Sequence, residues 1–527
     1  MSDIAQDYWW EQKWAHALLL LLLSVPLLYP TVPPLVDLPG HMGRYRVELD
    51  QGLNTPLTHF YHFQWQLIGN LGIDLLIIPV AKIFGLELGT KLIIMSIPVL
   101  TGFGTLWIAR EVHGKVTPTA LFALPFAYAH PFMFGFVNYT LSMALALNAF
   151  ALWLRLERLG RYRLRALLFL FIAPGLWICH IYGWAALCLL AASAEIVHQH
   201  DKRGAWLPAL FHAALNGIPL APPILLMLMW RSGAVAGQTA GWFIWQTKLA
   251  WFTETLRDHW FWFDIAWLIM AVLVLAVGVL EKFLSYSRNL AASAIILLIM
   301  YILIPYVVFG SAYADMRLTP FIFIIALVGI RIPEGTGKPT RRILGLLGLA
   351  YFGIRTAGTT LSFAQYASRA NRAMVALEHV PYGSRLLSIV GRTCATPWST
   401  SHLEHIPAMA MVRREAFSDD QWDMEGAQLL RSVYPVAQGG PWMLRAFAHD
   451  PAQMGLPDGC PLRIEPHFSW SMRNFPRDSF DYVWLMDPVK FDPRLLSGMH
   501  LIWQDGPYML YHVDDHRPLE QQLAEKQ

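Results

Sequence analysis

Long apolar runs recur along the first two thirds of this chain and then stop. They begin at Trp14 and end at Ala357, and most are long enough to cross the hydrocarbon core of a bilayer as a helix. Charged residues make up 15% of the 527 residues, whereas soluble domains carry about 25%. The pattern predicts a polytopic α-helical membrane protein. The net charge of +3 is small, so the sequence does not point to nucleic acid as a partner.

About eleven runs are interpreted as membrane spans, and one further apolar segment is ambiguous. The spans are 14–30, 90–109, 116–130, 136–154, 166–179, 181–196, 206–230, 264–280, 290–309, 318–330 and 341–357. The ambiguous segment, 67–85, contains Asp74 and Lys82, which are costly at bilayer depth unless protein surrounds them.

The basic loops indicate whether this segment crosses the membrane, because short cytoplasmic loops are enriched in Lys and Arg. The strongly basic short loops are 155–165, 198–204, 281–288 and 331–342. If the segment at 67–85 crossed the bilayer, all of them would lie outside. Treated as a re-entrant segment, it places all of them inside together. We therefore predict a cytoplasmic N-terminus, a first outer loop at about 31–89 and an extracytoplasmic tail.

Under this topology, the polar residues of the membrane part gather on the outer side. The candidate site residues are Asp37, His41, Arg44, His180, Tyr182, Lys248, Glu254, Asp258, Asp315 and Arg317. Two alternatives stay open for Arg317, which either forms an ion pair with Asp315 or holds a lipid-linked phosphate with its planar fork. His180 lies on an apolar face, where a histidine is more often a hydrogen-bonded core residue than a site residue.

The stretch "LVDLPGHMGRY" (35–45) follows directly on the first span. Pro39 suits the first turn of a helix, and apolar and polar residues then fall on separate stripes. The pattern predicts an amphipathic helix lying along the membrane surface. Asp37 either caps this helix or serves as a catalytic carboxylate, and one role does not exclude the other.

The tail, 358–527, has the composition of a globular α+β domain. "LLSIVG" and "DYVWLMD" are predicted as strands, and "HLIWQDGPYMLYHV" as a hairpin turning at Asp505-Gly506. "SDDQWDMEGAQLLRSV" is predicted as a helix capped by Ser418. The motif "HLEH" (402–405) is interpreted as surface polar residues, since it lacks the spacing of a helical zinc pair. Cys394 and Cys460 either pair or remain free thiols.

Several stretches together resemble the GT-C superfamily of integral membrane glycosyltransferases, over about the first 360 residues. They are "VDLPGHMGR", "GNLGIDLLIIPVAKIFGLELGTKL", "FGFVNYTLSMALAL" and, more weakly, "ADMRL". The chain looks most like the bacterial relatives of protein mannosyltransferases and aminoarabinose transferases. The resemblance implies a GT-C-like membrane module at 1–357 followed by an extracytoplasmic α+β domain at 358–527. It also implies a multi-pass protein of the bacterial inner membrane.

The family takes a sugar from a polyprenyl-phosphate donor and uses a carboxylate of the first outer loop as base. That role would fall on Asp37, with His41 orienting the site and Arg317, Arg44 or Lys248 holding the phosphate. The first loop lacks the D-x-D or E-x-D of better-known members, so no cofactor is assigned and a divalent metal ion is left open. The second acidic residue remains undecided among Asp315, Asp258, Glu254 and Asp264.

The hypothesis is an inverting glycosyltransferase that acts on an envelope glycan, lipid or protein acceptor. One rival is a transporter or flippase of a lipid-linked precursor, although such folds commonly show repeated halves and no internal repeat is visible here. Another rival is a membrane scaffold whose outer domain binds a partner.

Overall fold

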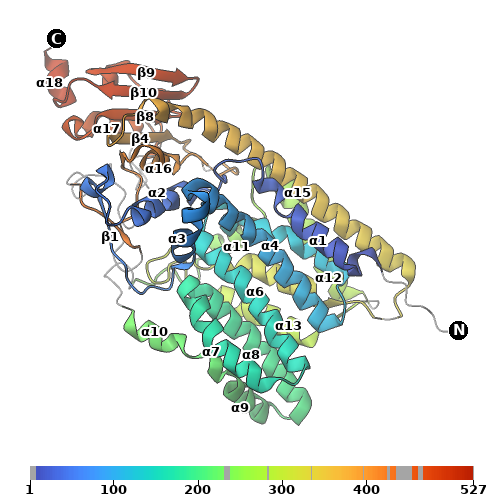
Figure 1. Cartoon of the computed structure of the whole chain (residues 1–527). Helices are drawn as coiled ribbons and strands as arrows, with labels where there is room; N and C mark the ends of the chain where they lie inside the picture. Colours follow the sequence, from blue (N-terminus) through green and yellow to red (C-terminus); the bar gives the residue numbers. More distant parts are fainter. Residues whose placement is uncertain are drawn as a thin grey trace.

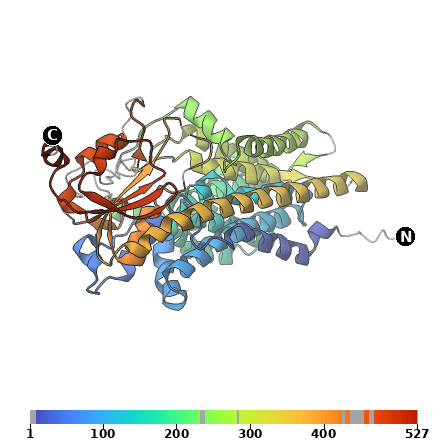
Figure 2. The same cartoon turned by 90° about the horizontal axis from the view of Figure 1, so that it is seen from above.

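The chain folds as a bundle of helices with a sheet domain on one of its ends, as the computed structural model shows (Figure 1). The structure describes residues 8–230, 238–281, 284–333, 335–395, 397–400, 402–423, 428–434, 454–460 and 467–525. The N-terminus lies at the end of the bundle away from the sheet domain, as a view from above also shows (Figure 2). We call the two ends of the bundle the loop end and the sheet-domain end.

The α-helices vary from single turns to one of 37 residues. In the bundle they are α1 (Lys13–Leu22), α2 (Leu38–Leu49), α3 (Gly72–Phe84), α4 (Leu86–His113), α5 (His130–Met133), α6 (Val137–Arg158), α7 (Tyr162–Cys179), α8 (Ile181–Arg203), α9 (Trp206–Gly217), α10 (Pro223–Met229), α11 (Trp245–Thr253), α12 (Phe261–Leu280), α13 (Arg288–Leu303), α14 (Thr319–Gly329) and α15 (Lys338–Met374). The sheet domain adds α16 (Met409–Arg414), α17 (Phe468–Asn474) and α18 (Leu519–Ala524).

Tighter 3₁₀ segments connect or extend these helices. They are η1 (Trp9–Glu11), η2 (Val25–Leu27), η3 (Pro56–His59), η4 (Pro118–Tyr128), η5 (Ile218–Leu220), η6 (Met316–Leu318), η7 (Val375–His379), η8 (Ile406–Ala408), η10 (Arg477–Ser479) and η11 (Pro493–Leu496). The predicted span at 116–130 is thus largely η4, and every residue of η4 is buried in the bundle.

Several helices are long and apolar enough to cross a membrane. Within the described residues, α4, α6, α7, α8 and α12 meet this criterion, and the bent pair 206–220 and 223–229 adds a sixth if it forms one span. Shorter apolar helices cover 13–27, 288–303 and 316–329. The protein is therefore mostly helical with several membrane-spanning candidates, and the count of eleven spans stays a prediction. Helix α15 continues without a break past the predicted domain boundary at 357.

The four basic loops of the sequence analysis lie together at the loop end. Arg158 pairs with Glu111 at the end of α4, at 2.7 Å. Arg288 pairs with Asp201 at 2.5 Å. Short strands β2 (Ser285–Tyr286) and β3 (Ile330–Arg331) pair and so join the loop 281–288 to the loop 331–342. This clustering is what a common cytoplasmic face requires.

Both ends of α3, the core of the ambiguous 67–85 segment, lie at the sheet-domain end. At its start, the Leu71 amide donates to the Ile178 carbonyl at the end of α7. At its end, Gly85 turns the chain directly into α4 with a φ of 74°. Glu87 then pairs with Arg413 of the sheet domain at 2.8 Å. The segment therefore enters and leaves the bundle on the same side.

The sheet domain contains one mixed sheet of order β5-β4-β8-β10-β9, with β7 also paired to β4. Its strands are β4 (Arg385–Gly391), β5 (Phe417–Ser418), β7 (Met454–Gly455), β8 (Tyr482–Met486), β9 (Met499–Asp505) and β10 (Tyr508–Val513). A separate pair joins β1 (Tyr61–Phe63) to β6 (Leu430–Ser432). The strands predicted from "LLSIVG" and "DYVWLMD" are confirmed as β4 and β8.

The predicted hairpin is also confirmed, with a turn one residue later than expected. Asp505 pairs with Tyr508, so Gly506 and Pro507 form the turn, and Gly506 has a φ of 57°. Cys394 and Cys460 form a disulfide, which decides between the two alternatives left open for these residues.

The helix predicted to begin after Ser418 is wrong for the residues that the structure describes. Ser418 ends strand β5, and 430–432 form β6, while 424–427 lie outside the described residues. The reason is burial, since the Asp419 carboxylate accepts a hydrogen bond from the Ser388 amide at 3.0 Å. Asp420 is also buried and bonds His405. These acidic side chains are held by the domain interior instead of facing solvent from a helix.

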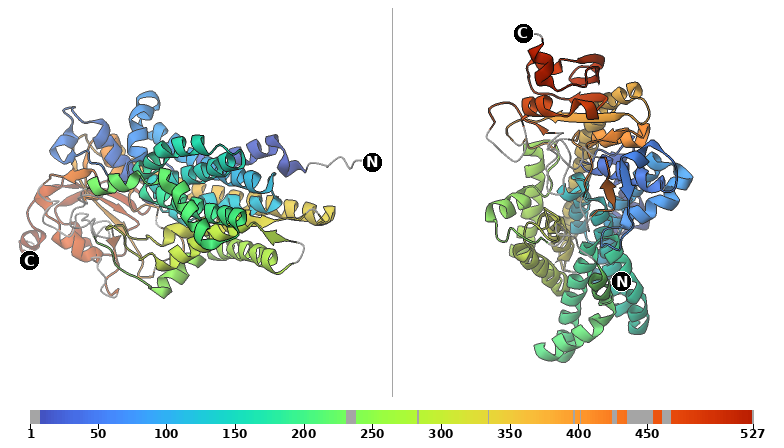
Figure 3. Two further views of the ribbon diagram at one scale, coloured as in Figure 1. Left: turned by 90° about the horizontal axis from the view of Figure 1, so that it is seen from below. Right: turned by 90° about the vertical axis from the view of Figure 1, so that its left-hand side faces the viewer.

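Helix α15 and α2 connect the two parts of the protein. Along the bundle, α15 runs from the loop end to the sheet domain (Figures 1 and 3). There, Arg372 forms an ion pair with Asp505 at 2.6 Å, and Arg369 with Asp487 at 2.5 Å. Helix α2 lies between the bundle and α16 (Figure 1), so the residues of α2 reach both parts.

Candidate functional site

Helix α2 is enclosed by protein, which corrects the expectation of a helix on the membrane surface. Most of its residues are buried, including residues of the predicted polar stripe such as Arg44 and Glu48. Close approach explains this: a Cβ on Gly40 would lie 2.6 Å from the Trp422 ring, and one on Gly43 would lie 2.9 Å from the Met411 sulfur. The glycines let the sheet domain pack directly on the helix.

Asp37 lies at the N-terminal end of α2, where Pro39 occupies the first turn. Its amide donates to the Phe134 carbonyl at 3.0 Å, which fixes the backbone against the segment preceding α6. The carboxylate makes no capping hydrogen bond to α2. It lies instead 3.7 Å from Nε2 of His405, and the Asp37 side chain is 14% exposed. The structure thus directs this carboxylate toward the sheet domain and away from a purely capping role.

His405 connects Asp37 to a second carboxylate. Its Nδ1 lies 2.6 Å from Oδ1 of Asp420, and the Asp420 side chain is fully buried. Asp420 is held in turn, since its other oxygen accepts a hydrogen bond from the Ala408 amide at 3.2 Å. Asp420, His405 and Asp37 therefore form a line from the interior of the sheet domain to the start of α2.

Burial and neighbouring charges set the protonation states of Asp37 and His405. Burial raises the pKa of Asp37, the His405 cation partly offsets the rise, and the resulting pKa is about 7. Burial by itself would lower the pKa of His405, but the carboxylates of Asp420 and Asp37 outweigh it and raise that pKa to about 9. Near neutral pH, His405 is thus a cation and Asp37 exchanges a proton readily. That is the range in which a general base is most effective.

The residues that complete this line have no predicted role from the sequence. The motif "HLEH" is predicted to be surface polar residues, yet His402 and His405 are buried. The Glu404 charge contributes to the raised pKa of Asp37, and its carboxylate pairs with Arg392. The signal was the combination of this motif with the acidic pair Asp419-Asp420, which the predicted helix had assigned to solvent.

Arg317 lies on the other side of the segment that touches Asp37. A Cβ on Gly135 would lie 2.7 Å from the Asp37 amide nitrogen, and the next residue, Phe136, stacks under the Arg317 guanidinium at 4.5 Å. The charge of Arg317 also lowers the pKa of Asp37, as one of the smaller contributions. Asp37 and Arg317 therefore flank one short segment at the sheet-domain end.

The Arg317 guanidinium is buried without a neutralising carboxylate. It is 5% exposed, and its Nη2 donates to the Ser311 hydroxyl at 2.9 Å. Its Nε is buried without a hydrogen-bond partner, and no carboxylate among the described residues pairs with it. Because a buried cation is costly unless an anion accompanies it, this arginine is suited to bind an anionic ligand.

The other two proposed phosphate ligands are engaged within the protein. Nη2 of Arg44 pairs with Asp74 of α3 at 2.8 Å. The Lys248 ammonium pairs with Asp315 at 3.0 Å and donates to the carbonyls of Tyr301 and Ile304. These three bonds use all the donors of an ammonium group. Asp315 thus pairs with Lys248, and among the described residues it forms no ion pair with Arg317; the phosphate role of Arg317 stays a prediction.

The remaining candidates are His41, His180 and Tyr182, and they lie near Asp37 or Arg317. His41 stacks against Trp422 with ring centroids 5.3 Å apart, one turn along α2 from Asp37. His180 accepts a hydrogen bond from the Tyr182 amide at the start of α8. The Tyr182 ring lies 5.3 Å from the Arg317 guanidinium carbon. His180 and Tyr182 thus lie on the Arg317 side of the site.

The acidic candidates Glu254, Asp258 and Asp264, which lie between the end of α11 and the first turn of α12, form a separate, structural network. Glu254 pairs with Arg257 at 2.8 Å. Asp258 accepts a hydrogen bond from Ser362 of α15 at 2.7 Å. Asp264 pairs with the buried Arg355 and accepts a bond from the Trp398 indole. This network fixes the loop against α15 and the sheet domain, and leaves Asp37 as the candidate base.

Within the part of the chain that the structure describes, no group of three potential metal ligands lies around Asp37. Among the described residues, three potential ligand atoms of the His, Cys, Asp and Glu type come within 4.8 Å of one another only at His500, His512 and Asp514. That group belongs to the β9–β10 hairpin. No step of the chemistry at Asp37 is therefore derived through a metal ion.

Comparisons with known proteins give a structural likeness and show no family. No family model matches the chain, and no curated protein matches it. A solved structure similar to it is that of the arabinofuranosyltransferase AftD from Mycobacteria, with 15% sequence identity and a TM-score of 0.43. The alignment covers 95% of this chain and 39% of that chain, so this protein spans well under half of its length. Function is accordingly argued from the geometry of the site.

Proposed function

We propose that the protein is an inverting glycosyltransferase that moves a sugar from a polyprenyl-phosphate donor to a hydroxyl group of an envelope glycan, lipid or protein. The observation that carries the proposal is the mostly buried carboxylate of Asp37, whose pKa is about 7, beside the same short segment as a buried, unneutralised arginine. A base and an anion-binding cation at the end of a membrane bundle match the needs of transfer from a lipid phosphate.

In the proposed reaction, Asp37 accepts the proton of the acceptor hydroxyl while that oxygen attacks the anomeric carbon. The new C–O bond forms as the bond from the anomeric carbon to the phosphate oxygen breaks, with inversion at carbon. The electron pair of the broken bond stays on the departing lipid phosphate, and Arg317 stabilises the developing charge with charge-assisted hydrogen bonds. The proton then leaves Asp37 for solvent.

His405 and Asp420 position the base. The short contact between them fixes the imidazole ring, and the positive charge on His405 lowers the pKa of Asp37 against the effect of burial. Without this cation, Asp37 would remain protonated over more of the neutral range. The two residues thus act on the reaction through Asp37.

Aromatic rings cluster around the segment that contacts both Asp37 and Arg317. The Tyr313 ring lies 5.1 Å from Phe134 and 6.1 Å from Phe136, measured between centroids, and Trp251 lies 5.7 Å from Tyr313. Flat apolar ring faces suit the C–H faces of a sugar. We assign this cluster to the sugar of the donor.

We place the protein in the bacterial inner membrane with its sheet domain on the extracytoplasmic side. The grouping of the four basic loops at the loop end supports this orientation through the positive-inside rule. The disulfide between Cys394 and Cys460 supports it independently, because structural disulfides form in oxidising compartments. The donor would then reach Asp37 from the outer leaflet.

The experiment that tests the function uses the full chain in lipid nanodiscs, with a mixed pool of polyprenyl-phosphate sugars as donors and a bacterial envelope extract as the source of acceptor hydroxyl groups. We expect release of free polyprenyl phosphate together with loss of the corresponding donor, measured by mass spectrometry of the lipid extract. A transporter or flippase would instead move intact donor across proteoliposomes without consuming it. Movement without consumption would reject the glycosyltransferase and favour that alternative.

Substitution of His405 tests the proposed proton linkage. Because the His405 cation lowers the pKa of Asp37, His405→Gln should raise that pKa and move the acidic limb of the pH–rate profile upward. If the limb moves up by one unit from its half-point of about 7, we expect the rate at pH 6.5 to fall by roughly 8-fold, with substantial recovery at pH 9. His402→Gln is the matched control, since His402 is buried in the same segment and stacks on Tyr366. An equal loss at every pH would contradict the linkage.

A further inference from the structure

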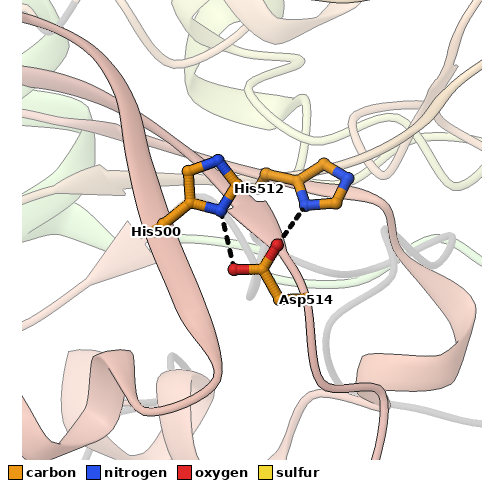
Figure 4. A group of neighbouring side chains, drawn as sticks. All are labelled: His500, His512 and Asp514. Carbon is orange, nitrogen blue, oxygen red and sulfur yellow. Dashed lines mark hydrogen bonds and ion pairs between the residues drawn. The ribbon is translucent and has the colours of Figure 1, made fainter.

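Two histidines and an aspartate converge on the exposed face of the β9–β10 hairpin (Figure 4). Nδ1 of His500 lies 2.7 Å from Oδ2 of Asp514, and Nδ1 of His512 lies 2.8 Å from Oδ1 of the same carboxylate. The two imidazole rings are 5.3 Å apart between centroids. One carboxylate thus gathers two imidazole nitrogens into a small space.

The backbone of the hairpin holds these side chains in place. His500 and His512 are direct cross-strand partners in the β9–β10 ladder, so their side chains lie on one face of the sheet. Asp514 follows two residues after His512, and its amide donates to the Gly498 carbonyl at 2.9 Å. The pairing therefore continues past the end of β10 and returns Asp514 to the face of the two histidines.

The types and number of these groups fit a transition-metal ion better than any other ligand. Imidazole nitrogens and a carboxylate oxygen are ligands of Zn²⁺, which binds them at about 2.0–2.2 Å and so places them about 3.3 Å apart in a tetrahedral site. The observed separations of 2.7 and 2.8 Å run to the two oxygens of Asp514, and one ligand atom from each residue lies within 4.8 Å of the others. A tetrahedral site therefore requires shifts of about 1 Å in these side chains. The side chains have room for these shifts, since His500 is 60% and Asp514 46% exposed.

We propose that His500, His512 and Asp514 bind one Zn²⁺ ion, with water or an anionic oxygen in the fourth position. Binding displaces the Nδ1 proton of each histidine, because the metal takes the neutral nitrogen lone pair. The ion replaces two hydrogen bonds and joins β9 to the chain that follows β10. The site lies on the outer hairpin of the sheet domain (Figure 1), on different elements from Asp37 and Arg317, and does not depend on the proposed function.

The test is zinc binding to the full chain, purified without a polyhistidine tag and stripped with a chelator. Isothermal titration with Zn²⁺ alone should give one site per chain, and Co²⁺ in its place should give the visible absorption of a tetrahedral ion. We expect His500→Ala and His512→Ala to weaken binding by at least the roughly 10- to 100-fold that loss of an outer-shell partner costs a metal site. Zn²⁺ should also raise the thermal midpoint of the unsubstituted chain, because it binds the folded state.

His62→Ala is the matched control, since His62 is an exposed histidine on strand β1, outside this hairpin. It should leave zinc affinity unchanged. His512→Gln preserves side-chain size and polarity, and gives the same comparison if an alanine variant fails to fold. The proposal is overturned if the chain binds no zinc, or if the His500, His512 and His62 variants bind it equally well.

Discussion

Replacement of Asp37 by asparagine is expected to lower the rate of sugar transfer by about 1,000-fold, within the range that a positioned general base supplies. The amide has nearly the size and shape of the carboxylate but cannot accept the hydroxyl proton. Since the Asp37 carboxylate makes no capping bond to α2, the helix loses no support. Burial raises the pKa of Asp37 to about 7, so the charged form is the costly one above that pH. The variant should therefore be at least as stable as the original chain at pH 8.

The measurement is release of polyprenyl phosphate in nanodiscs, with the thermal midpoint recorded in parallel. Asp50→Asn is the matched control, because Asp50 is a buried aspartate at the opposite end of the same helix and pairs there with Arg46 at 3.0 Å. That variant should retain most of the activity. Full activity of Asp37→Asn, with a protein level equal to that of the control, would remove Asp37 from the mechanism.

Local chemistry made the position of Asp37 predictable from the sequence, whereas its role as base is what the resemblance implies and stays a prediction. An aspartate directly before a proline-started helix, at the end of an apolar run, can be located without knowledge of distant residues. The hairpin at Gly506 and the strands β4 and β8 were predictable for the same reason, since turn residues and short apolar runs act over a few positions. The helical, multi-pass character of the bundle follows from run length alone.

The partners of Asp37 depend on packing between distant parts of the chain, and this is why the sequence did not reveal them. His405 lies more than 350 positions after Asp37, and only the docking of α16 and η8 on α2 brings them together. The motif "HLEH" lacks the spacing of a helical metal site, but it lies in a turn before η8, where His405 bonds Asp420. The segment after Ser418 has the polarity of a surface helix, but Asp419 and Asp420 are buried because backbone amides and His405 bind them.

Ion pairs within the protein also distinguish the three basic residues that the sequence suggests as phosphate ligands. From sequence, Arg44, Lys248 and Arg317 are equivalent cations near the same end of the bundle. In the structure, two of them have buried carboxylate partners, Asp74 and Asp315. Removing either would leave a buried carboxylate unpaired, which is destabilising by roughly 3–5 kcal/mol. Substitutions of Arg44 or Lys248 would therefore change stability as well as any activity, whereas Arg317 can be replaced without leaving an unpaired carboxylate behind.

Arg317→Ala is therefore expected to lower kcat/KM for the donor by roughly 100- to 1,000-fold, the effect of losing one strong stabilising group in the transition state. Binding of free polyprenyl phosphate, measured by native mass spectrometry, should weaken in the same variant, because the arginine holds the phosphate before and after transfer. The Arg317→Lys variant should have a kcat/KM between those of the original chain and Arg317→Ala, since an ammonium keeps the charge but lacks the planar fork that binds two phosphate oxygens.

Arg372→Ala is the matched control for this pair, because Arg372 is an exposed arginine whose ion-pair partner, Asp505, belongs to the sheet domain. It should change neither donor binding nor kcat/KM. The comparison with Asp37→Asn separates the two roles: the Asp37 variant should bind polyprenyl phosphate normally and fail to transfer, whereas the Arg317 variant should fail at both. If Arg317→Ala bound polyprenyl phosphate as tightly as the original chain, the anion site would have to be sought elsewhere at this end of the bundle.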